Sequence, residues 1–191
     1  MKNRLHAANG VASLLLLLLV ILCVAPQPAH ALARDFLTPK EEELIKEAQI
    51  LDKRVEVYVK AAERRLLMLT GQTAPVDKEA KKDSEKWGEL PTGTRTELIM
   101  DIANILDAAV TNIDDVALRD EKNALIPKAL RKLATSVTSI MEQLKPLRTE
   151  AKSDADIASL ELLNEDAQSI LEAAGKLPPE VDKKAKKNEK K

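Results

Sequence analysis

The fold of this chain is decided by two apolar segments, TRTELIMDIANILDAAVTNIDDVAL (residues 94–118) and PKALRKLATSVTSIMEQL (residues 127–144). In both segments apolar side chains recur every three or four residues, which is the spacing of one face of an α-helix. We therefore expect two amphipathic helices joined by a short break. The other segments of the chain are expected to pack against this pair.

Capping residues indicate where the helices begin. An N-cap side chain accepts a hydrogen bond from a free backbone N–H of the first turn, and in a capping box a Glu three residues later returns the bond. The residue pairs with this spacing are Thr38 with Glu41, Thr94 with Glu97, and Ser153 with Asp156. A further helix is expected to start at Pro127, because proline is favoured at the first helical position. Pro146 is expected to end or kink that helix.

The composition favours helices over sheets. Of the 191 residues, 45% are hydrophobic and 32% are charged, whereas only three are aromatic and five are glycine. We predict an all-α fold, an antiparallel four-helix bundle over residues 36–176. Its long first helix is expected to run unbroken from Pro39 to about Thr70, and a long connection over residues 72–93 leads to the second helix. Residues 177–191 are rich in lysine and are expected to form a disordered tail.

Each predicted helix has an apolar stripe that we expect to lie in the core. In chain order the stripes are Leu44, Ala48, Leu51, Val55, Tyr58, Ala62, Leu66 and Leu69; Leu98, Ile102, Ile105, Leu106, Ala109, Ile113 and Val116; Leu130, Leu133, Ala134, Val137, Ile140, Met141 and Leu144; and Ile157, Leu160, Leu163, Leu171 and Ala174.

The first 31 residues have the pattern of a signal peptide. Lys2 and Arg4 precede an unbroken apolar run at residues 11–25, and Ala29-His30-Ala31 fits the small-x-small rule for cleavage. The run is shorter than the ~20 residues that a membrane-spanning helix needs. We expect cleavage after Ala31, or after Ala33 as the close alternative, giving a secreted or periplasmic protein with no transmembrane helix in the mature chain.

Cleavage would remove both histidines, His6 and His30, and the only cysteine, Cys23. The mature chain would then lack the residues for a disulfide, for the usual zinc sites, for a cysteine nucleophile and for a Ser-His-Asp triad. We therefore expect a non-catalytic protein without a cofactor, which acts by protein binding or by assembly.

Carboxylates on the second and fourth predicted helices suggest an alternative function. Glu97 and Asp101 share one face of the second helix, and Glu161 and Glu165 share one face of the fourth. An all-carboxylate site would suit a divalent cation, although no loop has the EF-hand pattern. A solvated acidic face is the favoured interpretation, and an extracytoplasmic ligand or divalent-metal binder is the alternative.

A second apolar stripe on the first helix predicts an interaction surface. Ile50, Val57, Ala61 and Met68 fall together about 120° away from the core stripe. One helix of a simple bundle needs only one apolar stripe, so something else should cover this one. The candidates are the chain's own connection, with Val76, Trp87 and Leu90 folding back, and a protein partner or a second copy. For Trp87 itself, packing is favoured over stacking on a ligand.

Charge is distributed unevenly along the chain. From the second helix onward the elements alternate acidic, basic, acidic and basic, and short connections favour antiparallel packing of consecutive helices. The tail has lysines at positions 183, 184, 186, 187, 190 and 191, which could give weak contact with anionic surfaces. Without interleaved aromatics and arginines it does not indicate nucleic-acid binding.

Overall fold

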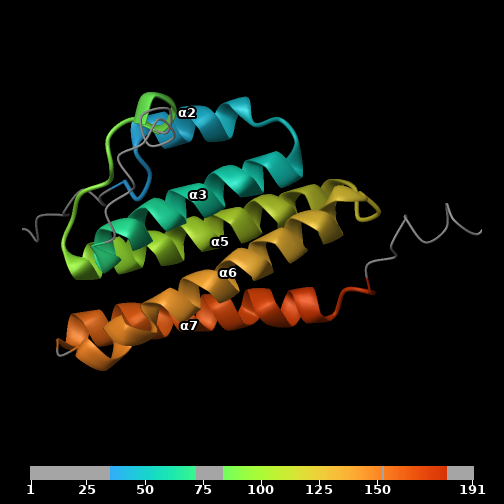
Figure 1. The fold of residues 1–191 in the computed structure, drawn as a ribbon. Coiled ribbons are helices and arrows are strands. Elements are labelled where there is room, and N and C mark those ends of the chain that lie inside the picture. Colours follow the sequence, from blue (N-terminus) through green and yellow to red (C-terminus); the bar gives the residue numbers. More distant parts are fainter. Residues whose placement is uncertain (1–34, 72–83, 152, 180–191) are drawn as a thin grey trace, which may run out of the picture. The chain divides into compact units, whose positions relative to one another are not determined.

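The computed structural model describes residues 35–71, 84–151 and 153–179, and the secondary structure of these residues is helical with no β-strand. The helices are labelled in Figure 1 and are α2 (Pro39–Glu47), α3 (Leu51–Thr70), α5 (Arg95–Arg119), α6 (Leu125–Glu150) and α7 (Asp154–Gly175). The all-α prediction is therefore confirmed. The predictions for residues 1–31, for Val76 and for residues 180–191 lie outside the described part of the chain.

The prediction of one unbroken first helix is wrong. The chain leaves the helical conformation at Ala48, where ψ is 86°, and it is extended at Ile50, where φ is −93° and ψ is 130°. The break has no Gly or Pro. It is held by a side chain from the next helix, because Arg54 Nε donates a hydrogen bond to the Ala48 carbonyl at 2.8 Å.

The break turns α2 back along α3, and Figure 1 shows the two helices side by side. Leu44 on α2 is buried as a result. A continuous helix would have left the second apolar stripe of α3 open on this side. Folding back allows α2 to cover part of that stripe, so apolar burial offsets the backbone hydrogen bonds that the break interrupts.

The predicted helix starts are found where the capping signals lie. Thr38 and Thr94 each form a complete capping box, and the Ser153 side chain accepts from the Asp156 N–H. Gly71 is the C-cap residue of α3, with φ of 63°, as Gly at this position predicts.

Two boundaries of α6 differ from the prediction. The helix starts at Leu125, two residues before Pro127, and it continues past Pro146 to Glu150. Pro127 is tolerated because the first four N–H groups of a helix have no intrahelical acceptor. Continuing the helix past Pro146 costs one backbone hydrogen bond, because proline has no N–H to donate.

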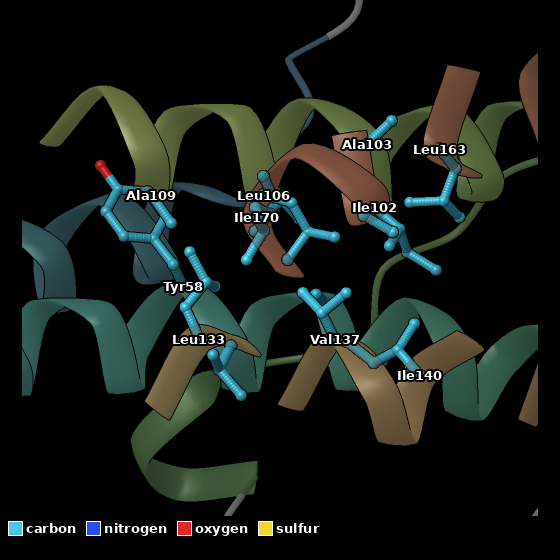
Figure 2. Packing of buried hydrophobic residues seen from close by; sticks show 14 of the residues in the cluster. Tyr58, Ile102, Ala103, Leu106, Ala109, Leu133, Val137, Ile140, Leu163 and Ile170 are labelled. Carbon is cyan, nitrogen blue, oxygen red and sulfur yellow. The ribbon is translucent and has the colours of Figure 1, made fainter. Parts of the chain in front are cut away.

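The core is formed by the inner faces of α3, α5, α6 and α7 (Figure 2). Most predicted core positions on α3, α5 and α6 are buried. On α7 the prediction is confirmed for Leu160 and Leu163 and is wrong for Ile157 and Leu171, which are exposed. The buried residues that it missed are Ser159, Ala167 and Ile170.

Contacts between helices follow the predicted charge alternation only in part, because α6 packs against α7 but hardly against α5. Helix α3 packs against α5 and α6, and α7 also packs against α5 and α6. The consecutive helices α5 and α6 touch each other much less. Two acidic helices, α5 and α7, therefore lie side by side, and their first turns are joined by a hydrogen bond from Thr96 to Asp156. Surface charge attraction is weak and screened, so apolar burial decided the pairing.

Candidate functional site

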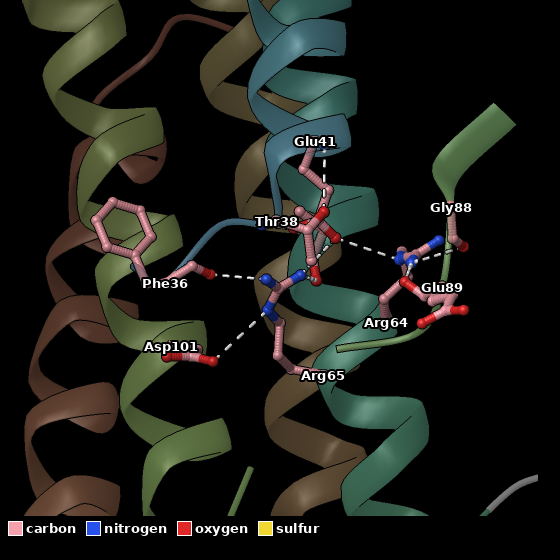
Figure 3. A network of polar contacts seen from close by, with 9 residues as sticks. Phe36, Thr38, Glu41, Arg64, Arg65, Gly88, Glu89 and Asp101 are labelled. Carbon is pink, nitrogen blue, oxygen red and sulfur yellow. Dashed lines mark hydrogen bonds and ion pairs between the residues drawn. The ribbon is translucent and has the colours of Figure 1, made fainter. Parts of the chain in front are cut away.

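The most elaborate polar cluster surrounds Glu41, which is completely buried (Figure 3). One carboxylate oxygen, Oε2, accepts the Thr38 N–H at 2.9 Å and so completes the capping box. The other, Oε1, is 2.5 Å from Arg65 Nη1 and 3.2 Å from Arg64 Nε. A single carboxylate therefore caps α2 and pairs with two arginines of α3.

Arg65 connects this carboxylate to two further parts of the chain. Its Nη2 donates to the Phe36 carbonyl at 2.7 Å, and its Nη1 also donates to the Ala61 carbonyl at 2.9 Å. Its Nε lies 3.9 Å from Asp101 Oδ2 on α5. Arg65 thus fixes the segment before α2 and the first half of α5 against α3.

Arg64 connects the same carboxylate to the connection that precedes α5. Its Nη2 donates to the carbonyls of Gly88 and Glu89. Its guanidinium carbon is 5.8 Å from the centroid of the Trp87 ring, within the range of a cation–π interaction. Gly88 has φ of 69°, and a Cβ there would lie 3.5 Å from the Lys40 side chain, so the connection passes close over α2.

These contacts indicate that the polar cluster has a structural role. Glu41 and Arg65 are closed to solvent, so neither can reach a substrate. Buried pairs of this kind are costly to break, because removing one partner leaves an uncompensated charge. The ion pairs between Glu41 on α2 and the arginines of α3 explain why α2 is folded back on α3. We name this set, Glu41 with Arg64, Arg65 and Asp101, the Glu41 cluster.

The predicted metal candidates are separated in the structure. Glu97 caps its own helix by accepting the Thr94 N–H at 2.6 Å. Asp101 is buried in the Glu41 cluster, so the solvated acidic face predicted for it is wrong. Glu161 and Glu165 are exposed on α7. Among the described residues no three acidic, His or Cys side chains come together in a way that could hold a metal ion.

The predicted interaction residues divide into buried and accessible ones. Ala61 is fully buried and Trp87 is only 5% exposed, which agrees with the packing interpretation of the indole. Ile50 is 54% exposed and Met68 is 40% exposed. Val57 is half-buried and lines an open hollow. Of the connection residues expected to fold back, Leu90 remains exposed.

The hollow at Val57 has a volume of about 380 Å³ and lies between α2, the start of α3 and Trp87. Its lining combines an apolar floor with a charged rim and consists of Leu44, Glu47, Ala48, Lys53, Glu56, Val57, Lys86 and Trp87. We call it the α2–α3 hollow. Sequence reasoning placed Val57 and Trp87 here but missed Leu44, because it assigned Leu44 to the core stripe of an unbroken helix.

A second concave site lies where α5, α6 and α7 meet. Its volume is about 260 Å³, and it combines apolar residues with three aspartates: Asp107, Val110, Ile113, Asp114, Leu130, Asp166, Ser169, Ile170 and Ala173. We call it the acidic groove. Burial raises the pKa of Asp166, and the nearby carboxylates of Asp107 and Glu165 raise it further. Sequence reasoning expected acids on these two helices but selected others, because it could not foresee that α5 and α7 are neighbours.

Across the other pair of neighbouring helices the charges are matched. Lys128 on α6 lies 2.5 Å from Asp52 on α3, and Lys132 pairs with Glu56 one turn further. The hydrogen bond from Lys128 lowers the pKa of Asp52, and the bond from Lys132 lowers the pKa of Glu56. These pairs fix the register of α6 against α3.

None of the described helices combines the length and apolar character needed to cross a lipid bilayer. Comparison of the chain with protein-family models, with curated proteins and with solved structures finds no match. The functional argument therefore depends on the residues and contacts described above.

Proposed function

We propose that this protein is exported and non-catalytic, and that it acts by binding a protein partner or by assembly through the α2–α3 hollow. The observation that carries the proposal is the chemistry of that hollow. An apolar floor formed by Leu44 and Val57 is surrounded by charges of both signs, which is the usual composition of a protein interface with an apolar centre and a polar rim.

The surroundings of the hollow support this assignment. Ile50, in the break between α2 and α3, is a large apolar side chain that is more than half exposed, and it follows Ala48 of the hollow by two residues. The Glu41 cluster holds α2 and Trp87 in place from behind. A preorganised surface binds more tightly than a mobile one, because less ordering entropy is lost on association.

The finer architecture is part of the same proposal. We infer that α3, α5, α6 and α7 form a four-helix bundle in which consecutive helices run antiparallel. The neighbouring pairs α3–α6 and α5–α7 then run parallel, since Lys128 and Lys132 pair in order with Asp52 and Glu56 and the first turns of α5 and α7 are joined. In support, Arg54 near the start of α3 donates to Asn112 in the second half of α5 at 3.2 Å, whereas Arg65 near the end of α3 approaches Asp101 in the first half of α5. Helices α3 and α5 therefore run in opposite directions.

The substitution Val57→Lys tests the function. It places a charge on the floor of the hollow, and Leu118→Lys is the matched control because Leu118 is 86% exposed at the far end of α5. We expect the wild type and Leu118→Lys to retain the same protein from the exported fraction, or to form the same oligomer by light scattering, and Val57→Lys to lose it. If all three proteins behave alike, the hollow is not the interface.

The alternative function is binding of a ligand or divalent metal by carboxylates of α5 and α7. One observation favours a cationic ligand, although the described carboxylates form no cluster that could hold a metal ion. These two acidic helices are neighbours, and Asp107, Asp114 and Asp166 line one groove between them. A thermal melt with millimolar Ca²⁺, Mg²⁺ or Mn²⁺ separates the two functions. A specific site raises the melting temperature, because a ligand that binds only the folded state stabilises it.

A further inference from the structure

The carboxylates of the acidic groove have no cationic partners among the described residues. Within the described part of the chain, no side-chain ion pair or hydrogen bond is formed by Asp107, Asp114 or Asp166. This differs from the opposite side of the fold, where Asp52 and Glu56 each have a lysine partner. The groove therefore presents three carboxylates over an apolar floor without the cations that would balance them.

The arrangement of the helices makes this imbalance larger. Helix α7 has six carboxylates and no basic residue, and α5 has five carboxylates and two arginines. A concave site lined by one sign of charge concentrates the electrostatic potential and attracts the opposite charge. The occupant that fits best is a cationic segment with few bulky side chains.

A segment of this kind belongs to the chain itself and begins next to the groove. Helix α7 ends at Gly175, and three residues later the Pro178 carbonyl accepts a hydrogen bond from Arg131 on α6. Arg131 follows Leu130, which lines the groove. The described chain thus ends at Pro179, close to the end of the groove that α7 itself helps to form.

The following segment has the required charge and length. Residues 180–191 include six lysines, and their only apolar residues are Val181 and Ala185. Twelve residues can span up to roughly 40 Å when extended. Asp107 and Asp114 are two helical turns apart, roughly 10 Å along α5, so the segment is long enough to pass all three aspartates.

We propose that residues 180–191 bind in the acidic groove of their own chain, with lysine ammonium groups paired to Asp107, Asp114 and Asp166. Each of these pairs is weak and is screened by salt. The covalent connection compensates for this weakness, because a short tether gives the segment a high effective concentration at the groove.

Nuclear magnetic resonance of the ¹⁵N-labelled protein, with its complete C-terminal segment, tests the proposal. The variant replaces the six lysines by serine: Lys183→Ser, Lys184→Ser, Lys186→Ser, Lys187→Ser, Lys190→Ser and Lys191→Ser. We expect the amide signals of Val110, Ile113, Ser169 and Ala173 to shift at low salt. Signals from α2 and α3 should stay in place, which shows that the fold is unchanged.

A second pair of variants tests whether the aspartates are the binding partners. In Asp107→Asn/Asp166→Asn the lysine substitutions should no longer shift the groove signals. In the matched control Asp115→Asn/Glu121→Gln, which removes the same charge outside the groove, the shift should persist. If the lysine substitutions do not change the chemical shifts of the groove amides, the proposal is wrong. A shift that weakens on dilution also overturns it, because the segment would then come from a second copy.

Discussion

The carboxylate of Glu41 and the guanidinium of Arg65 lie 2.5 Å apart, and both side chains are closed to solvent. They are 24 residues apart in the sequence and sit on two helices that the sequence presents as one. Their pairing requires the break at Ala48 to Ile50, because residues this far apart on one continuous helix would be separated by roughly 36 Å. The ion pair can therefore form only when the helix is broken between Glu47 and Leu51.

Removing the Glu41 carboxylate should lower the free energy of unfolding more than any surface substitution does. Glu41→Ala leaves Arg65 and Arg64 buried without their shared carboxylate, and we expect a loss of about 3–5 kcal/mol in the free energy of unfolding. Urea denaturation followed by Trp87 fluorescence measures it. Glu43→Ala is the matched control on the same helix, since Glu43 is exposed and its ion pair among the described residues is with Lys40. A loss below ~1 kcal/mol for Glu41→Ala would mean that the cluster does not hold α2 in place.

The two capping boxes should contribute measurably to stability. Thr38→Ala and Thr94→Ala each leave the N–H of the third helical residue without its side-chain acceptor. We expect each to cost on the order of 1 kcal/mol. Thr111→Ala, at an exposed position inside α5, should cost nothing, because alanine is the better helix former there. Denaturant midpoints equal to wild type for both cap variants would contradict the observed helix starts.

The ion pairs between α3 and α6 should make stability depend on pH. The pKa values of Asp52 and Glu56 are lowered in the fold, so their contribution is complete above the unfolded-state values of about 4 and is lost as the pH falls through the lowered folded values. We expect unfolding free energy to decline between roughly pH 5 and pH 2. In Lys128→Met, which removes the partner of Asp52, the decline should be shallower. An identical pH profile in the variant would contradict this assignment.

The start of the mature protein is a prediction from the sequence alone. We expect mass spectrometry of the exported protein to find Leu32 or Arg34 as the first residue, because signal peptidases cleave after small residues that follow an apolar run. Protein that retains residues 1–31 would support an uncleaved anchor instead.

Local signals in the sequence predicted most of the helical elements correctly. Thr38, Thr94, Ser153 and Gly71 act through neighbours three or four residues away, so their effects can be read from the sequence. The break after Glu47 could not be read in this way. Ala48, Gln49 and Ile50 are compatible with a helix, and the conformation is set by Arg54 and by the distant pairing of Glu41 with Arg65.

The candidate sites were predicted less completely than the helices. Val57 and Trp87 were recognised because an extra apolar stripe and a lone indole are visible in the sequence. The acidic groove was missed because it depends on which helices are neighbours. Charge alternation suggested α5 beside α6, whereas burial of apolar side chains places α5 beside α7.

Among the described residues, charge is separated between the pair α3 and α6 and the pair α5 and α7, which gives these four helices a transverse electric dipole. Helices α3 and α6 carry an excess of lysine and arginine, and α5 and α7 carry an excess of carboxylates. A dipole in this direction experiences a torque near any charged surface, independently of specific contacts. At an anionic surface the protein would rotate until α3 and α6 face it, and α5 and α7 would then face the solution. Its orientation at such a surface would be set by the long-range field before any side chain touches the surface, and would weaken as ionic strength rises.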